Sequence, residues 1–506
     1  MKKIGLTVGQ NTPYNLRFRS HEPPRVGQFV VVKDGSRMYL GLVSRTFSEN
    51  PFFDESIPTP SDIEKLRRLA GNRIIYEALV NLLGEITDYG ISTLKTPPTP
   101  NSTVYEADSD ILKRVFRAED ERFVRIGVLL SNPDVPVYIN LEQAVLRHMA
   151  ILAITGAGKS NTVGVLLEKV SEKRGTALIL DIHGEYRSLR MPGGRVNIIK
   201  PIIDPALLEL DELAGLLGID MDSAAQMYYL LSVVKERVDE RWFSSSNGQD
   251  NEFDAFMREK GDYLEEIKTE LENTLEDKEE RSIYGRDTIT RLLNRLQLLM
   301  GRFKALFRNN ATPLLEQIKE HRINVLDLSE LDEEKADIII SHILHKVLKD
   351  RKGDVDKRHL KAPIVAVLEE AHLFASRNKR TRSRYILNRI AREGRKFGVG
   401  LWIVSQRPKG LDPDVLSQMN NMIILKLVEP EDQSHVQKSS EMLSRELIEY
   451  LPALNPGEAI AIGNMTRIPI LVKIDRSGAK IEGQDPPVIS SWNESRADVE
   501  FLDEPL

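Results

Sequence analysis

The chain has 506 residues, 41% of them hydrophobic and 29% charged, and a formal net charge of −6 at pH 7. This length exceeds what one hydrophobic core usually organises, so we expect several folded units. The chain has no cysteine, which excludes disulfides and thiolate metal sites. It also has no apolar run near the roughly 18 residues that span a bilayer and no apolar signal segment, which together predict a cytoplasmic protein without membrane segments.

Residues 1–140 are expected to form a small β-barrel, because short runs of β-branched and aromatic residues alternate there with Pro and Gly turns. The strand-like segments are residues 4–8, 28–32, 38–43 and 125–130. A helix is expected over 61–74, where Ser61 and Asp62 precede apolar residues at helical spacing. The region has no cluster of titratable residues at useful spacing, so we expect it to dock partners rather than to catalyse a reaction.

From about residue 147 the pattern changes to strands that alternate with helices, which is typical of an α/β fold with a parallel sheet and flanking helices. Buried strands are expected at 149–154, 176–181, 323–328, 363–368, 399–405 and 422–427. A long segment rich in Leu, Glu, Lys and Arg at helical spacing interrupts them and predicts a helical insert. The expected units are a core in two parts (141–204 and 321–475), the insert (205–320) and an extended C-terminal arm (476–506).

The strongest motif is a phosphate-binding loop that ends in Gly156-Ala157-Gly158-Lys159-Ser160, between an apolar strand and a helix-like segment. The glycines let backbone amides close around phosphates at a helix N-terminus. Lys159 is expected to neutralise the β- and γ-phosphates of ATP, and Ser160 to bind Mg²⁺. Ala153 stands where the usual pattern has its first glycine. The residues expected to hold the nucleotide are Thr155, Gly156, Ala157, Gly158, Lys159, Ser160 and Asn161.

Two carboxylates, Glu369 and Glu370, end the expected strand 363–368. Carboxylates beside a buried strand are costly unless a cation meets them. Glu369 is therefore expected to support the Mg²⁺ shell, a place usually held by Asp, and Glu370 to orient or deprotonate the attacking water. The alternative is a pair of solvated acids at the start of a helix.

Two further strand ends carry polar side chains. Gln406 follows strand 399–405, where it is expected to sense the γ-phosphate; the alternative is a glutamine that only forms a turn. Asp181 ends strand 176–181 at the same rim of the sheet, where ligands bind in such folds. Asp181 and Glu185 are candidates to bind Mg²⁺ or its water, and the alternative is a simple bend after the strand.

Residues 377–396 contain nine Lys or Arg residues and one acid, Glu393. On a chain of net negative charge, nucleic acid would bind at such a local basic stripe. The residues expected to contact nucleic-acid phosphates are Arg377, Lys379, Arg380 and Arg382. Another arginine of the run could reach across a subunit boundary to stabilise the phosphoryl transition state. The alternative is a solvated helix face.

Four more motifs are informative as a set: Arg147-His148, residues 181–186 (Asp-Ile-His-Gly-Glu-Tyr), 368–372 (Leu-Glu-Glu-Ala-His) and 393–398 (Glu-Gly-Arg-Lys-Phe-Gly). With the phosphate loop they resemble the HerA family of archaeal DNA translocases, relatives of the bacterial chromosome pump FtsK. The resemblance spans nearly the whole chain. It implies an N-terminal barrel, a RecA-like P-loop NTPase core with a helical insert, and a C-terminal extension.

The same resemblance implies a homohexameric ring that pumps double-stranded DNA. It also implies work with a NurA-like nuclease in DNA end resection, for double-strand break repair by homologous recombination. Arg147 would act in the site of its own subunit and Arg395 in that of its neighbour, with Arg392 as the competitor to Arg395. The rival interpretations are a conjugation- or secretion-type pumping ATPase and a slow, nucleotide-switched binding module. Glu370, Gln406 and the arginines favour turnover over switching.

Overall fold

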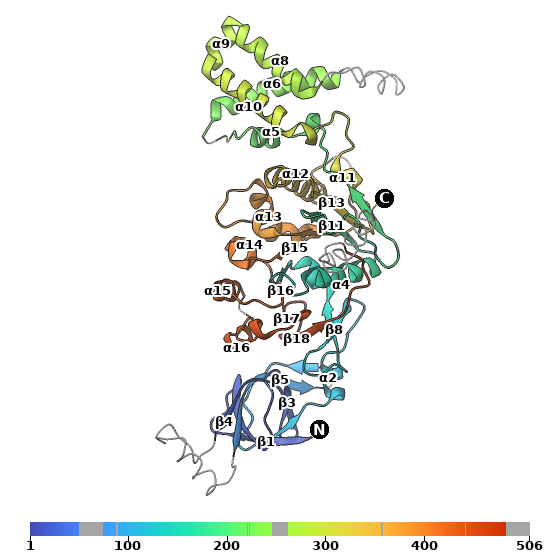
Figure 1. Ribbon diagram of the computed structural model, residues 1–506, viewed down its shortest axis with the longest axis vertical. Helices are drawn as coiled ribbons and strands as arrows, with labels where there is room; N and C mark the ends of the chain where they lie inside the picture. Colours follow the sequence, from blue (N-terminus) through green and yellow to red (C-terminus); the bar gives the residue numbers. More distant parts are fainter. Residues whose placement is uncertain are drawn as a thin grey trace, which may run out of the picture.

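The computed structural model describes residues 1–49, 74–87, 90–219, 221, 223–244, 262–355, 358–440 and 442–481. The helix expected over 61–74 lies almost wholly outside these ranges, as does the part of the expected arm beyond residue 481. Figure 1 shows three bodies stacked along the long axis: a barrel at the N-terminal end, a large sheet with helices in the middle, and a helical insert at the far end. Among the described residues, none of the helices combines the length and apolar character needed to cross a bilayer.

The N-terminal body is a closed barrel of six strands, because β2 pairs with β5 as well as with β1. Its sheet order is β2-β1-β7-β3-β4-β5-β6, with β6 as an added edge strand. Residues along β2 alternate between exposed and buried, as a strand with one face on a core requires. The strands are β1 (Lys3–Val8), β2 (Asn15–Ser20), β3 (Phe29–Asp34), β4 (Arg37–Glu49), β5 (Ile75–Thr87), β6 (Gly90–Ser92) and β7 (Thr103–Glu106).

The middle body is built on an 11-stranded sheet in the order β12-β13-β11-β14-β15-β10-β16-β17-β18-β8-β9. Strands from β12 to β16 in this order are all parallel, and the remaining pairings are antiparallel. The strands are β8 (Phe123–Leu129), β9 (Pro136–Asn140), β10 (Met149–Leu152), β11 (Thr176–Asp181), β12 (Val196–Ile199), β13 (Ile323–Asp327), β14 (Ile364–Leu368), β15 (Val399–Ser405), β16 (Asn421–Ile424), β17 (Glu458–Gly463) and β18 (Ile470–Ile474).

The parallel part of this sheet confirms the six strands expected from the sequence, at β10, β11, β13, β14, β15 and β16. Every residue of β14 and of β15 is buried, because helices cover both faces of a parallel sheet. The strand expected at 125–130 exists as β8, but it does not belong to the barrel. It pairs with β18, so Val124, Ile126 and Leu129 join the core of the large sheet.

Helices flank the sheet and connect its strands. They are α3 (Leu141–Leu146), α4 (Lys159–Glu172), α12 (Glu333–Lys352), α13 (Arg382–Glu393), α14 (Pro413–Ser417), α15 (Pro430–Ser439) and α16 (Arg445–Ile448). A further helix, α2 (Ser109–Val115), lies beside β6 of the barrel (Figure 1). Short 3-10 helices are η1 (Pro205–Leu207), η2 (Lys304–Leu306), η3 (Ala371–Leu373), η4 (Gly394–Phe397), η5 (Pro408–Gly410) and η6 (Leu451–Ala453). The parallel strands give the sheet a carboxyl edge, where they end, and an amino edge, where they begin.

The insert between β12 and β13 is helical, as its spacing predicts. It contains α5 (Leu210–Leu216), α6 (Ala225–Ser244), α8 (Tyr263–Glu276), α9 (Lys278–Tyr284), α10 (Arg286–Phe303) and α11 (Leu314–Gln317). The inner face of α10 buries Ile289, Leu292, Leu296 and Leu299. Trp242 of α6 and Tyr263 of α8 pack edge to face with their ring centroids 5.2 Å apart.

Candidate functional site

The loop between β10 and α4 has the backbone geometry that phosphate binding requires. Gly156 and Gly158 have φ angles of 76° and 100°, which residues with a side chain rarely adopt. A Cβ atom on Gly158 would also lie 3.0 Å from the backbone nitrogen of Gly457. Ala153 is fully buried, and its N–H donates to the carbonyl of Ser405 at 3.2 Å. Ala153 thus follows β10 directly, still bonded to β15, and its φ is not positive, which explains why this position does not need glycine.

Lys159 reaches from the first turn of α4 to the end of β14. Its Nζ lies 2.5 Å from Oε1 of Glu370 and 3.3 Å from Oε2 of Glu369. The lysine is 7% exposed and both glutamates are 4% exposed. Burial alone would lower the pKa of Lys159, but the two carboxylates outweigh burial and raise that pKa. The ammonium is therefore held charged between two buried acids.

The two glutamates have different surroundings. Burial raises the pKa of Glu369, whose Oε1 accepts a 2.6 Å hydrogen bond from the hydroxyl of Tyr186. Burial acts in the same direction on Glu370, but Lys159 outweighs it and lowers the pKa of this carboxyl. Glu370 also has a left-handed backbone, with φ of 45°, a strained conformation typical of functional sites. Glu370 is thus the carboxylate held ionised at the strand tip.

Gln406 joins the phosphate loop to this carboxylate. Its Nε2 donates to Oε1 of Glu370 at 2.7 Å, and its Oε1 accepts a hydrogen bond from the hydroxyl of Thr155. β15, which carries Gln406, lies between β10 and β14, so a tip residue of β15 is adjacent to both neighbours. The geometry brings together four of the residues selected from the sequence: Thr155, Lys159, Glu370 and Gln406.

Asp181 has a local partner set. It accepts hydrogen bonds from the backbone N–H groups of Gly184, Glu185 and Tyr186, and burial raises its pKa. It thereby fixes the turn that presents Tyr186 to Glu369. Glu185, on the same turn, accepts a 2.9 Å hydrogen bond from the hydroxyl of Ser160. Asp181 remains a metal candidate from the sequence, and Glu185 is the acid that the structure brings to Ser160.

Asn161 points away from the loop. Its Nδ2 donates to the carbonyl of Asp475 at 2.9 Å, and its Oδ1 accepts from the N–H of Ser477 at 2.9 Å. The side chain therefore ties α4 to the segment after β18.

Sequence reasoning gave no role to Tyr186 or to His372. Nδ1 of His372 lies 3.4 Å from Oε2 of Glu370 and 3.2 Å from the hydroxyl of Ser405. Both residues stand inside motifs already noted: His372 lies two positions after Glu370, and Tyr186 lies five positions after Asp181. Their positions close to strand ends were the available signal, because side chains there meet at one rim of the sheet.

The two arginines expected at the transition state lie at the opposite, amino edge of the sheet. Arg147 precedes β10, whose four residues separate it from the phosphate loop by about 13 Å. Arg395 lies in η4 immediately before β15 and is exposed. The backbone of Arg147 therefore lies at the edge opposite the phosphate loop of its own chain, and the role that the resemblance implies for its side chain stays a prediction. The structure places Arg147 on the same edge as Arg395.

The basic run does not form one continuous stripe. Arg377 and Arg380 are exposed, whereas Lys379 pairs with Glu333 at 2.8 Å. Arg382 is half-buried, and burial lowers its pKa. One of its guanidinium nitrogens would lie 3.3 Å from a Cβ atom built on Gly215, so it faces α5 of the insert. Of the four residues proposed for nucleic acid, Arg382 is the one turned inward.

The residues present suit a nucleotide with a divalent cation. Lys159 faces two carboxylates, so this buried set has one more acid than it has cations, which a bound cation would balance. Within the described ranges, no cluster of three or more His, Asp or Glu side chains could hold a metal alone. Mg²⁺ in nucleotide sites commonly takes one or two protein ligands plus phosphate oxygens and water. Ser160, whose hydroxyl contacts Glu185, and Glu369 stay the candidate ligands from the sequence.

The parallel sheet, the glycine loop before α4 and the carboxylates at the adjoining strand tips define a P-loop NTPase with a RecA-like core. A family model described as "Helicase HerA, central domain" matches residues 124–347. A DNA double-strand break repair helicase HerA of Sulfurisphaera tokodaii is 38% identical over 98% of this chain and 98% of its own length. A probable helicase of Methanocaldococcus jannaschii is 38% identical over 99% of this chain and 96% of its own. The chain belongs to the HerA helicase family.

Solved structures show the same fold at low identity. VirB4 of Thermoanaerobacter pseudethanolicus aligns with a TM-score of 0.52 and 18% identity, covering 71% of this chain and 98% of that one. The plasmid coupling protein TrwB, in complex with a non-hydrolysable ATP analogue, aligns with a TM-score of 0.51 and 14% identity, covering 75% and 95%. Together with the family match they confirm the predicted fold class.

Proposed function

We propose that this chain is an ATP-hydrolysing, Mg²⁺-dependent motor that forms a ring and moves double-stranded DNA. The observation that carries the proposal is the contact of Lys159 with Glu370 at the tips of adjoining elements, bridged to the phosphate loop by Gln406. This contact supports the proposal, because a lysine suited to bind phosphate and a carboxylate suited to activate water lie side by side. The names of the relatives, DNA double-strand break repair helicases, support DNA as the substrate.

Each residue of the site has a step in the proposed reaction. Ser160 and Glu369 would hold Mg²⁺, which would supply positive charge to the phosphate oxygens. When ATP binds, Lys159 leaves Glu370 and contacts the β- and γ-phosphates, because these carry more negative charge than one carboxylate. Glu370, released from Lys159, accepts a proton from the attacking water. Gln406 keeps contact with both Thr155 and Glu370. A change at the γ-phosphate would therefore shift Gln406 and, through it, the end of β15.

The decisive experiment is an ATPase assay of the purified chain with and without blunt duplex DNA. We expect duplex DNA to stimulate hydrolysis. A conjugation- or secretion-type pump, which the fold of TrwB and VirB4 also fits, would respond to single-stranded DNA or protein instead. A nucleotide-switched binding module would hydrolyse slowly under all conditions. Unstimulated, slow turnover would overturn the proposal.

We further propose a hexameric ring that works with a NurA-like nuclease in DNA end resection for recombinational repair. Support comes from the repair function in the relatives' names and from the arginine edge, which faces away from the chain's own phosphate loop. The nuclease is expected to dock on the barrel, whose described residues contribute no side chain to the cluster around Lys159. Hydrogen exchange of the full chain with added nuclease should show protection within residues 1–106. Protection confined to the insert would contradict barrel docking.

A further inference from the structure

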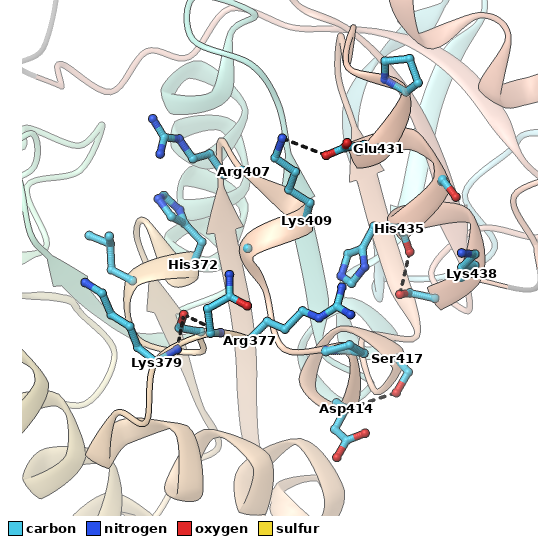
Figure 2. Close-up of a pocket in the computed structure, with 18 of the residues that line it drawn as sticks. His372, Arg377, Lys379, Arg407, Lys409, Asp414, Ser417, Glu431, His435 and Lys438 are labelled. Atoms are coloured by element: carbon cyan, nitrogen blue, oxygen red, sulfur yellow. Dashed lines mark hydrogen bonds and ion pairs between the residues drawn. The ribbon is translucent and has the colours of Figure 1, made fainter.

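A large polar groove opens beside the catalytic cluster. It has a volume of about 1350 Å³ and is lined by segments that follow the carboxyl ends of β14, β15 and β16. These segments are η3 with the loop after it, η5, α14 and α15. Figure 2 shows His372 and Arg407 on one side of this groove and His435 and Lys438 on the other. The groove is separate from the phosphate loop, none of whose residues line it.

The groove carries an excess of positive charge. Its cationic side chains are Arg377, Lys379, Arg407, Lys409 and Lys438, and its acids are Glu333, Asp414 and Glu431. Each acid has a partner: Lys379 lies 2.8 Å from Glu333, Lys409 lies 3.2 Å from Glu431, and Arg392 lies 3.7 Å from Asp414.

Three cations of the groove remain: Arg377, Arg407 and Lys438. None of the three forms an ion pair within the part of the chain that the structure describes. In Figure 2 the side chain of Arg377 extends toward His435. Cations spread along an open groove, rather than converging on one point, suit successive phosphates of a nucleic-acid backbone.

His372 connects this groove to the base. It lines the groove, yet its Nδ1 lies 3.4 Å from Oε2 of Glu370 and 3.2 Å from the hydroxyl of Ser405. That hydroxyl also accepts a hydrogen bond from the N–H of Arg407 at 3.1 Å. Arg407 in turn follows Gln406, which holds Glu370. The groove wall and the catalytic carboxylate are thus separated by a single imidazole.

We propose that this groove binds the phosphodiester backbone of DNA, and that His372 positions Glu370 for catalysis when the groove is occupied. This inference rests on the proposed DNA-driven motor function and names the part of the site that senses DNA.

The charges around His372 give the mechanism. Burial lowers the pKa of His372, Glu370 opposes this, and Arg407 and Lys159 add to the lowering, with Glu333 acting weakly against it. A phosphate on Arg407 offsets the cation that disfavours the imidazolium, and Lys159 turns to the nucleotide when ATP binds. Both changes favour a protonated His372 that holds Glu370 through Oε2 after Lys159 has left Oε1. The base is then oriented toward water only when DNA and nucleotide are both present.

The test uses the full chain, blunt duplex DNA, and ATPase rates measured over a range of DNA concentrations. Arg377→Ala and Lys438→Ala should each raise the DNA concentration for half-maximal stimulation by about three- to tenfold, and reduce the salt slope of binding by about one. His372→Leu should instead lower the maximal stimulation while the half-maximal DNA concentration stays constant. His372→Asn, whose amide can still donate to Glu370, should recover part of the maximum. Lys33→Ala, on the exposed face of the barrel, is the matched charge control.

The outcomes separate the claims. If Arg377→Ala and Lys438→Ala both keep the wild-type half-maximal DNA concentration and the wild-type salt slope, DNA binds elsewhere and the inference is overturned. A His372→Leu variant that shifts the half-maximal concentration but not the maximum would make His372 only a wall of the groove. If the wild-type chain shows no stimulation by duplex DNA, the proposed function itself fails, and the inference with it.

Discussion

The two edges of the large sheet are built in opposite ways. At the carboxyl edge, Lys159, Glu369 and Glu370 are buried and satisfy one another within a single chain. At the amino edge, Arg395 is exposed, and Arg392 has only a 3.7 Å contact to Asp414 between two exposed side chains. Surface pairs of this kind contribute little to stability. The buried charges of the first edge have partners within one chain, whereas the second edge presents exposed cations at the end of the sheet away from that chain's phosphate loop.

In the ring that we propose, the two edges would belong to neighbouring subunits of one site. A phosphoryl transition state needs positive charge on its open side, and a cation supplied in trans can add about 10³–10⁵ in rate. The amino edge of one subunit would supply that charge to the carboxyl edge of the next. Four substitutions test the comparison, taken from the largest expected effect to the smallest.

The largest effect is expected from Lys159→Ala. The substitution removes the cation that the phosphates need and takes the lysine ammonium away from two buried carboxylates, so nucleotide binding and hydrolysis should both be lost. Titration with a non-hydrolysable ATP analogue measures the binding. Lys169→Ala, on the same helix and paired with Glu172 at 2.7 Å, is the control and should bind normally. Retained binding in Lys159→Ala would mean that the nucleotide sits elsewhere.

Arg395→Ala should lower kcat by about 10³–10⁵ while nucleotide binding persists, because the arginine acts on the transition state. Mixing this variant with Lys159→Ala should restore part of the activity, since some boundaries then join an intact loop to an intact arginine. Arg392→Ala is the matched comparison on the same edge. Normal hydrolysis by Arg395→Ala alone would place the trans cation elsewhere. If Arg395→Ala has no ATPase activity and mixing does not restore any, Arg395 acts in its own subunit or in folding.

Glu370→Gln should lower kcat by about 10²–10⁴, which is the range for loss of a general base. Unlike Lys159→Ala, this variant should still bind ATP, because the amide keeps the shape of the side chain and Lys159 remains. Single-turnover assays that separate bound from cleaved ATP measure binding and cleavage independently. Near-normal turnover would remove Glu370 from the role of base.

His148 should have the smallest effect, through stability. This buried residue accepts a 3.0 Å hydrogen bond from the N–H of Leu401 and has its pKa lowered to about 4, chiefly by burial. Its neutral form stabilises the fold above about pH 6.5, and that stability is lost as pH falls toward 4. The loss is about 3 kcal/mol, because one pKa unit is worth about 1.4 kcal/mol. His148→Asn should therefore flatten the dependence of the free energy of unfolding on pH between 6.5 and 4.

Chemical denaturation at a series of pH values, with wild type beside the variant, measures this flattening. The other eight histidines are common to both proteins, so they cancel in the difference. Because His148 lies between Arg147 and β10, and its ring would lie 3.6 Å from a Cβ atom on Gly394, the substitution also tests the packing under the arginine edge. An unchanged slope would show that His148 is not held neutral.

The sequence by itself determined the phosphate loop, six of the seven parallel strands that the structure describes, and the carboxylates that end one of them. Each is encoded locally, by glycines with positive φ or by short apolar runs bounded by polar residues. Chain direction alone would also have located Arg147, since a residue that precedes β10 lies at the end opposite the loop that follows it.

Only the tertiary structure decided which of these groups meet. Lys159 and Glu370 are 211 positions apart, and the strand order that brings their elements together follows from packing of the whole sheet, which no local pattern encodes. The same packing explains why β8 belongs to the large sheet and not to the expected barrel. It also explains why Arg382 faces α5, why Asn161 contacts Ser477, and why His372 lies between Glu370 and the groove. Residue type indicated the chemistry available at each position, and the fold determined which partner each side chain reaches.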